Sequence, residues 1–346
     1  MINVSNENAS TVDSITDFTI MSYNCLASNL AKSQYFPKSD PVYLDFGYRS
    51  KLFEGEFKRF DSDIVCVQEM NKNDFQTWLL PYMIQLGYAP GLFSERGGTA
   101  EDGVSTFYKR DKFSLLHYER LGYSDYAEAQ YKSWKNKLPL EQFNLATYNA
   151  ALFCNLKMLK NNKSVWIVNT HINWNTAHAH TQLFQVKALL TELVRLNQDN
   201  TTFVIVGDFN SKPESIVVEY LLKGYVETTS LHYKNVYDMY STIFDSKERS
   251  GQYLAEKHSF KTIESAYNEQ TFQLPFTSRI AGHFEGSIDW IWYQKDKLKP
   301  VVLLNALNTD DEKVLQKERD KFTLPNEKHP SDHLPIMVKF QFLSTN

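Results

Sequence analysis

The sequence has few cysteines, no long apolar run and no excess of positive charge, and each shortage excludes a class of protein. Three cysteines in 346 residues do not fit a small secreted fold held together by disulfides. We expect these three, which lie in apolar surroundings, to be reduced and buried. No stretch approaches the roughly 20 apolar residues that a membrane-spanning helix needs. Residues 1–17 are polar and lack the apolar core of a signal peptide. We therefore expect a cytoplasmic protein that does not enter a membrane.

The net charge of −4 at pH 7 is unusual for a protein that binds nucleic acid, because Lys and Arg supply most of the affinity for phosphates. A chain of this charge that binds RNA needs metal ions or local basic residues at its site. Hydrophobic residues make up 42% of the chain and aromatic residues 14%, enough for a large buried core. We find no internal repeat, low-complexity tract or interdomain linker.

Polar residues stand at the ends of, or within, six short, β-branched apolar runs. Such runs are typical of buried strands. They carry Asn24, Glu69, His171, Asp208 with Asn210, Asp289, and Asp332 with His333. A buried sheet cannot hold unpaired carboxylates in its interior, so the acids must lie at strand ends. Several such ends on one rim would form an oxygen-rich pocket, which favours a hard cation: Mg²⁺, with Mn²⁺ as a substitute.

Helical spacing of apolar residues predicts helices around 52–60, 75–86 and 183–194. Three regions, 29–43, 123–144 and 246–281, lack regular periodicity, and we expect them to be long loops around the pocket. Trp174 is expected to be a packing residue rather than a stacking surface.

The polar segments resemble the motifs of the endonuclease/exonuclease/phosphatase superfamily, whose members hydrolyse phosphoester bonds with a divalent metal. The matching segments are Ser22-Tyr23-Asn24, Gln68-Glu69, Thr170-His171, Gly207-Asp208-Phe209-Asn210, Ile288-Asp289 and Ser331-Asp332-His333. The resemblance implies an α/β fold with a four-layer α-β-β-α sandwich of two packed mixed sheets, the deoxyribonuclease-I-like fold. It also implies a single catalytic domain over 18–346, preceded by a flexible segment over 1–17.

Further segments are similar to one branch of that superfamily, which holds the carbon-catabolite-repressor-type poly(A) deadenylases, nocturnin, the angel proteins and 2′-phosphodiesterases. They are Met21 to Ala27, Tyr48-Arg49 and Leu324-Pro325-Asn326. This resemblance implies an Mg²⁺-dependent 3′–5′ exoribonuclease that releases 5′ nucleotides from single-stranded RNA such as poly(A). No leucine-rich repeat is present, the region that larger deadenylases of this branch use to dock on their scaffold complex. The sequence does not indicate other protein partners.

Three alternatives remain. A nocturnin-like phosphatase would act on NADP(H) or a related adenine dinucleotide. A DNA endonuclease or a phospholipid or inositol-phosphate phosphodiesterase would share the fold, but Tyr48-Arg49 and Leu324-Pro325 argue against both. A catalytically silent RNA-binding adaptor would be expected to have lost metal or phosphate ligands, whereas this chain has every acid, amide and histidine of the motifs.

The resemblance also implies roles for the metal-binding and water-activating residues. Glu69 and Asp332 would be the main metal ligands. Asn24 would be an amide-oxygen ligand or would position a water. Asp208 would orient or deprotonate the attacking water, and Asn210 would hold a phosphate oxygen or a second metal.

The histidines and the substrate side complete the implied site. Asp289 would accept a hydrogen bond from His333, which would act as a base or as a charge stabiliser. His171 would donate a hydrogen bond to the phosphoryl oxygens. Asn149 resembles a phosphate-contacting asparagine, with an ordinary turn as the alternative. Phe284 matches an aromatic residue that stacks on adenine, with a core position as the alternative, while the proline that faces it in the family is replaced by Thr176, which puts adenine preference in doubt.

Overall fold

The β-branched and aromatic runs form two sheets in the computed structural model of the protein, which describes residues 2–3, 17–134, 138–260, 262–268 and 275–343. In pairing order, the first sheet contains β1 (Ile2–Asn3), β14 (Leu298–Leu303), β15 (Ile336–Phe342), β2 (Asp17–Asn24), β3 (Ile64–Asn71), β5 (Asp102–Tyr108) and β4 (Leu92–Glu95). The second contains β10 (Ile263–Ser265), β13 (Asp289–Gln294), β9 (Thr202–Asp208), β8 (Ser164–His171), β7 (Ala150–Met158) and β6 (Phe113–Gly122). A separate hairpin consists of β11 (Ser278–Ile280) and β12 (Phe284–Gly286).

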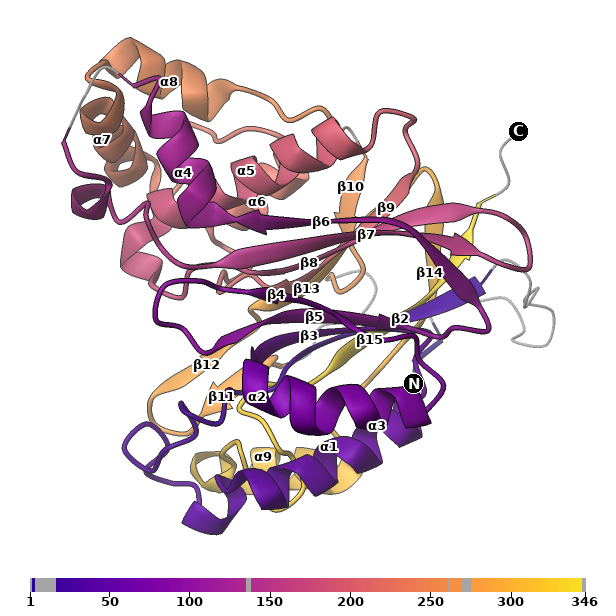
Figure 1. Ribbon diagram of the computed structural model, residues 1–346. Coiled ribbons are helices and arrows are strands. Elements are labelled where there is room, and N and C mark those ends of the chain that lie inside the picture. Colours follow the sequence, from indigo (N-terminus) through magenta and orange to yellow (C-terminus); the bar gives the residue numbers. More distant parts are fainter. Residues whose placement is uncertain (1, 4–16, 135–137, 261, 269–274, 344–346) are drawn as a thin grey trace.

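The helices cover the outer faces of the two sheets. They are α1 (Phe46–Phe60), α2 (Lys72–Asp74), α3 (Leu80–Gln85), α4 (Tyr123–Tyr131), α5 (Ala179–Leu196), α6 (Ile216–Lys223), α7 (Tyr233–Phe244), α8 (Lys247–Ala255) and α9 (Thr309–Lys317). A π-helical turn (Phe75–Leu79) joins α2 to α3, and 3₁₀ turns span Pro41–Tyr43, Leu140–Phe143, Thr176–His178 and Arg319–Lys321. Figure 1 shows α1 and α3 outside the first sheet and α4 to α8 beyond the second.

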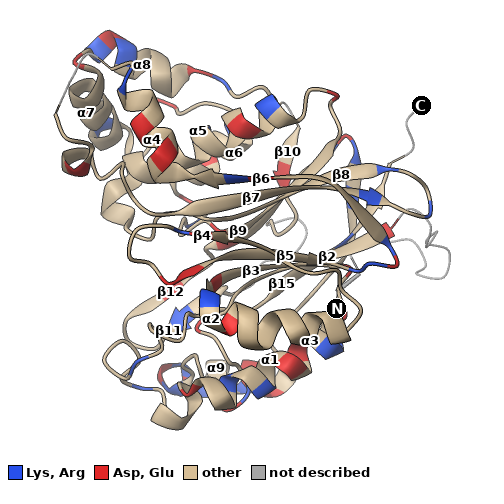
Figure 2. Ribbon diagram, in the orientation of Figure 1, with Lys and Arg blue, Asp and Glu red and all other residues tan. Residues whose placement is uncertain are grey.

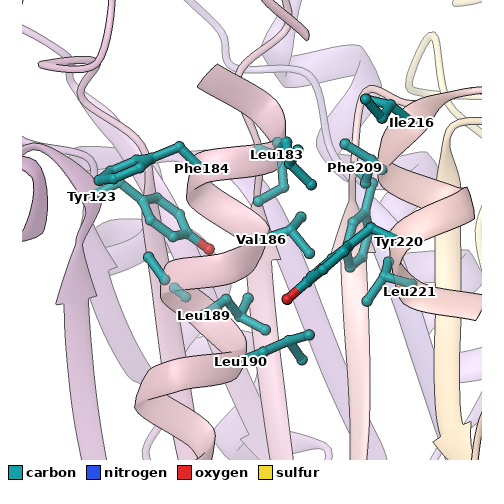
Figure 3. Packing of buried hydrophobic residues seen from close by; sticks show 14 of the residues in the cluster. Tyr123, Leu183, Phe184, Val186, Leu189, Leu190, Phe209, Ile216, Tyr220 and Leu221 are labelled. Atoms are coloured by element: carbon teal, nitrogen blue, oxygen red, sulfur yellow. The ribbon is translucent and has the colours of Figure 1, made fainter. Parts of the chain in front are cut away.

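Three apolar clusters hold these layers together. Between the sheets, the inward-facing side chains of both, such as Ile20, Val204 and Val338, form one buried cluster. A second lies under α1 and α3, and a third under α5 and α6, where Figure 3 shows Leu183 and Val186 close to Phe209. The charged residues lie mainly on the outer helices and the loops (Figure 2). The predicted four-layer sandwich is therefore confirmed, and the three cysteines are free and buried as expected.

Two of the predicted loop regions contain helices. Residues 123–144 include α4, and residues 246–281 include α8. Helix α8 presents one fully buried apolar residue, Leu254, so its sequence has no apolar stripe. Its start is fixed instead by Ser246, whose hydroxyl accepts a hydrogen bond from the backbone N–H of Arg249. Capping and side-chain hydrogen bonds of this kind do not show in a pattern of hydrophobicity.

Three residues of the segment 1–17, which is predicted to be flexible, lie in the described part of the chain. Ile2 and Asn3 pair with β14, and Asp17 begins β2; residues 1 and 4–16 lie outside the described part. None of the helices in the described part is both long and apolar enough to cross a membrane.

A buried lysine under the outer helices gives a testable pH dependence. Lys187 of α5 donates a hydrogen bond to the carbonyl of Tyr253 at 2.6 Å and lies 3.6 Å from Glu256. Burial lowers the pKa of Lys187 to about 8, below its value in the unfolded chain. Between these two pKa values the unfolded state binds more protons, so the stability that Lys187 contributes increases with pH.

We therefore expect the wild-type protein to gain about 1 to 2 kcal/mol relative to Lys187→Met between about pH 7.5 and about pH 10. Urea unfolding of both proteins across that range measures this difference. A difference that stays constant with pH would contradict the prediction.

Candidate active site

The first sheet brings three of the motif segments to one edge. Strands β2 and β3 are parallel and are joined by α1, so their carboxyl ends, with Asn24 and Glu69, lie on the same side. Strand β15 runs antiparallel to β2. The segment that precedes β15, with Asp332 and His333, therefore enters at that same edge.

The second sheet repeats this arrangement. Strands β8 and β9 are parallel and are joined by α5, which places His171 opposite Asp208. Strand β13 runs antiparallel to β9, and its first residue, Asp289, is also opposite Asp208. Three motif residues thus form a row across three neighbouring strands.

Asn24 joins the two edges. Its amide nitrogen donates hydrogen bonds to Glu69 Oε1 and to Asp208 Oδ2, both at 3.0 Å. Its amide oxygen accepts from the backbone N–H of Leu26 at 3.0 Å. The amide nitrogen of Asn24, not its oxygen, faces the carboxylates. This arrangement favours a role for Asn24 in positioning the two carboxylates rather than the predicted role of an amide-oxygen metal ligand.

Glu69 is held in an unusual backbone conformation. Its φ angle is +52°, a region that costs a residue with a side chain on the order of 1 kcal/mol or more. The pairing of β3 with β5 shifts register between Val67 and Met70, and such a bulge redirects a side chain. Glu69 Oε2 accepts a hydrogen bond from the backbone N–H of Ala27 at 3.3 Å. The strand is therefore distorted at the residue that aims its carboxylate at the site.

His333 and Asp289 form the expected hydrogen-bonded pair, with Nδ1 and Oδ2 2.8 Å apart. Burial alone would lower the pKa of His333, but Asp289, Asp332 and Asp208 together raise it well above its usual value. Thr277 fixes Asp289, because its hydroxyl oxygen accepts a hydrogen bond from the backbone N–H of that residue at 3.1 Å. His333 is therefore favoured as an imidazolium whose Nε2 faces Asp208 at 3.7 Å.

Asp208 lies at the centre of the cluster. Its Oδ1 accepts from the backbone N–H of Asn210 at 2.8 Å, and its Oδ2 lies 3.6 Å from His171 Nε2. Burial and the neighbouring Asp289 raise the pKa of Asp208 to about 8. Gly207 before it is required by space, since a Cβ there would lie 1.9 Å from the carbonyl oxygen of Thr170.

His171 and Asn210 are in contact on the far side of Asp208. The Asn210 amide nitrogen lies 3.2 Å from His171 Nε2 and donates to the carbonyl of Ile172 at 3.0 Å. Burial lowers the pKa of His171 to about 4. The opposite shifts of the two pKa values favour a neutral imidazole at His171 and an imidazolium at His333.

Asp332 is half-buried beside this cluster. Burial raises the pKa of Asp332 to about 6, and the charge of Glu69 adds to the shift, although His333 opposes it. Burial would also raise the pKa of Glu69, but His171, Asn24 and other neighbours hold it below its usual value. The Glu69 carboxylate is thus close enough to Asp332 for its charge to raise the pKa of Asp332.

The two substrate-side candidates lie at opposite flanks of the row. Asn149 is buried directly before β7, and its amide oxygen accepts from Gln185 Nε2 at 3.3 Å. Phe284 begins β12 and is half-buried rather than part of the core. The ammonium of Lys212 lies 5.3 Å from the centre of its ring, so one face of Phe284 is covered by a cation.

The sequence model of the endonuclease/exonuclease/phosphatase family matches residues 21–333 of the chain. The chain belongs to this family. It is 32% identical over 348 residues to the CCR4-Not complex 3′-5′-exoribonuclease subunit Ccr4 of Candida albicans, covering 95% of the chain and 42% of that relative. The chain therefore spans less than half the length of this relative. The branch that the motifs predicted is confirmed.

Solved structures of the family share the fold. The crystal structure of ANGEL2, a 2′,3′-cyclic phosphatase, in complex with adenosine-2′,3′-vanadate gives a TM-score of 0.75 at 23% identity, covering 94% of this chain and 96% of that one. The human nocturnin catalytic domain with bound sulfate gives 0.62 at 20% identity, covering 94% and 95%. At these identities the likeness concerns the fold alone, and it agrees with the predicted sandwich.

The chemistry of the donor groups fits the divalent metal associated with the family. Ligand atoms of Glu69, His171 and Asp208 lie within 4.8 Å of one another, and so do those of Asp208, Asp289 and His333. Carboxylate oxygens are the ligands that Mg²⁺ and Mn²⁺ prefer. A cation would also offset the crowding that helps to raise the pKa of Asp208 and Asp332. Asp332 belongs to neither group, so its pairing with Glu69 as a ligand stays a prediction.

Arg49 is a supporting residue whose role was not predicted from the sequence. It is fully buried, and it donates to the carbonyl oxygens of Cys25, of Leu26 at 2.6 Å and of Pro330 at 2.5 Å. It therefore ties the loop after Asn24 to the segment that carries Asp332. The Tyr48-Arg49 motif was the available signal, but a motif alone does not say that an arginine holds backbone carbonyls.

Proposed function

We propose that this chain is a 3′–5′ exoribonuclease of the deadenylase type, which hydrolyses single-stranded RNA and releases 5′ nucleotides. The observation that carries the proposal is the convergence of the six motif segments into one hydrogen-bonded cluster. Its support is the similarity over 95% of the chain to a relative named as a 3′-5′-exoribonuclease. Since the acids and histidines are all present in this arrangement, nothing in it favours a silent adaptor.

We propose Mg²⁺, replaceable by Mn²⁺, as the cofactor, with Glu69 and Asp332 as its main ligands. When bound, such an ion stabilises negative charge on the phosphoryl oxygens. Asn24 holds the Glu69 and Asp208 carboxylates apart and in orientation through its amide nitrogen. This fixed spacing prepares the site before substrate arrives.

The remaining residues activate the attacking water or stabilise charge on the phosphate. Asp208, whose pKa is raised to about 8, would be ionised once a bound cation offsets this shift; the carboxylate then orients the attacking water or accepts a proton from it. His333, held by Asp289, stabilises negative charge on the phosphate as an imidazolium or, in its neutral form, acts as a base. Asn210 and the neutral His171 complete the set of hydrogen-bonding groups around the phosphoryl oxygens.

On the substrate side, Phe284 and Asn149 are proposed as contacts for the base and for a phosphate. Lys212 over the Phe284 ring adds a positive charge near the phosphate-binding residues, which the chain needs at a net charge of −4. Poly(A) is the proposed substrate, and single-stranded RNA of other sequence stays open because Thr176 offers no flat apolar face. The cytoplasmic location and the protein partners stay predictions.

The test is trimming of end-labelled oligo(A), oligo(U) and oligo(C) with Mg²⁺, with EDTA and with the Glu69→Ala variant. We expect stepwise shortening from the 3′ end that EDTA and the variant both abolish. Intact oligonucleotides in Mg²⁺ and in Mn²⁺ would overturn the proposal. Release of phosphate from NADP(H), without trimming of RNA, would replace it with a nocturnin-like dinucleotide phosphatase.

A further inference from the structure

Trp174 is exposed where a packing residue was expected. Its side chain is 70% exposed, although the backbone around it is anchored. Asn173 is buried, and its N–H donates to Gln185 Oε1 at 2.8 Å while its carbonyl accepts from Gln182 Nε2 at 2.8 Å. A rigid backbone thus presents a large aromatic ring to solvent, three residues after His171. Packing of the fold gives no reason for a tryptophan there.

A second exposed aromatic residue lies on the neighbouring segment. Tyr148 is 52% exposed and directly precedes Asn149. Its ring covers Gly98, where a Cβ would lie 2.6 Å from the ring carbons, so one face of the ring is held in place. Gln185 also donates to Thr147 Oγ1 at 2.8 Å and to Asn149. Because the same glutamine bonds the segments on both sides, Tyr148 and Trp174 belong to one fixed corner of the site.

The strand register places this corner beside the phosphate-binding residues. Strands β13, β9, β8 and β7 are neighbours, and their paired residues at this edge are Asp289, Asp208, His171 and Ala150. With strands about 4.8 Å apart, this row spans about 14 Å. Phe284 lies on the hairpin that leads into β13, the strand at one end of the row. Tyr148 lies two residues before β7, the strand at the other end.

We propose that Trp174 and Tyr148 form a base-stacking subsite for a nucleotide next to the scissile phosphate, on the flank opposite Phe284. Stacking on an aromatic face accepts any base, and it supplies affinity that does not depend on positive charge. That suits a chain with a net charge of −4. The ring of Trp174 also supplies a flat surface two residues before Thr176. The inference rests on the proposed function, because it names the part of the substrate that this corner holds.

The test compares Trp174→Ala, Tyr148→Ala and Trp174→Phe on oligo(A) and oligo(U). We expect KM to rise about 5- to 100-fold in the two alanine variants, for both sequences, with kcat within about threefold. Trp174→Phe should retain most of the affinity. Tyr118→Ala, which removes an aromatic side chain 44% exposed in the middle of β6, is the matched control and should behave as wild type. Unchanged thermal unfolding will show that each variant folds.

Oligonucleotides with one abasic residue, at the terminal or at the penultimate position, identify the stacked nucleotide. One of the two abasic oligonucleotides should have a higher KM than the intact oligonucleotide with the wild-type protein. With Trp174→Ala its KM should equal that of the intact oligonucleotide, because the ring that stacks on the missing base is already absent. Equal losses in both proteins, or an unchanged KM in Trp174→Ala, would overturn the subsite.

Fluorescence anisotropy of the same oligonucleotides separates this inference from the proposed function. One outcome is that the wild-type protein binds the intact oligonucleotide more tightly than the abasic one, while Trp174→Ala binds both equally, and yet the wild-type protein trims neither. In that case the exonuclease proposal fails and the subsite stands. If binding is the same in both proteins, the subsite fails whatever the result for trimming.

Discussion

Asp289→Asn is expected to lower kcat by about 10³- to 10⁴-fold, with KM within about threefold of wild type. The Asp289 carboxylate lies 2.8 Å from His333 Nδ1 and helps to raise the pKa of that imidazole. An asparagine has the same shape but no charge, so it neither stabilises the imidazolium nor fixes the ring in the same protonation state. Steady-state kinetics on oligo(A) measure the change.

The matched control is Asp296→Asn, an exposed carboxylate just beyond the other end of β13. It should keep wild-type kinetics. An Asp289→Asn variant within tenfold of wild type in kcat would show that the His333–Asp289 pair has a structural role only.

The pH profile of Asp289→Asn separates the two roles open to His333. Loss of the carboxylate lowers the pKa of His333, so the ring loses its proton at a lower pH than in wild type. If His333 acts as a charged stabiliser, the residual activity falls as pH rises through this lowered pKa. If His333 acts as a base, the residual activity rises over the same interval.

Glu69→Gln is expected to lower kcat/KM by more than about 10³-fold and to raise the Mg²⁺ concentration needed for half-maximal activity at least about tenfold. The amide keeps the size of the side chain but removes the negative charge that a hard cation requires. It can still accept a hydrogen bond from the backbone N–H of Ala27, so the loop after Asn24 should keep its shape. A Mg²⁺ titration of initial rates measures both effects.

Glu95→Gln is the control for that experiment, because Glu95 is a half-exposed acid at the end of β4 that forms an ion pair with Lys72. Its titration should superimpose on that of wild type. An unchanged Mg²⁺ dependence in Glu69→Gln would exclude Glu69 as a ligand and leave the cluster without its proposed metal site.

The positions of the site residues were predictable because parallel strands leave little freedom. Asn24 with Glu69, and His171 with Asp208, each end two parallel strands joined by a helix, so each pair must meet at one edge of its sheet. The acids at these ends could not be buried elsewhere without partners. Pattern and solvation together therefore predicted the place of the polar cluster at strand ends, whereas the four-layer sandwich was predicted from the resemblance to the family.

What the sequence did not show depends on contacts between distant residues. The amide of Asn24 is oriented by the N–H of Leu26 and by a carboxylate 184 positions away, and no local pattern records that choice. Tryptophan is usually buried, yet the side chains of Gln182 and Gln185 hold the backbone of Asn173 so that the Trp174 ring beside it is exposed. Helices α4 and α8 bury few apolar side chains, Tyr123 and Ala127 from α4 and Leu254 from α8, so the apolar periodicity of their sequences is weak.

Anomalous diffraction from a crystal of the protein soaked with Mn²⁺ tests most directly whether these distant residues share a metal. We predict a manganese peak coordinated by the carboxylates of Glu69 and Asp332, in the cluster that also contains Asp208 and His333. A manganese peak held by other residues, or no peak at this cluster in a crystal that binds Mn²⁺ elsewhere, would contradict it.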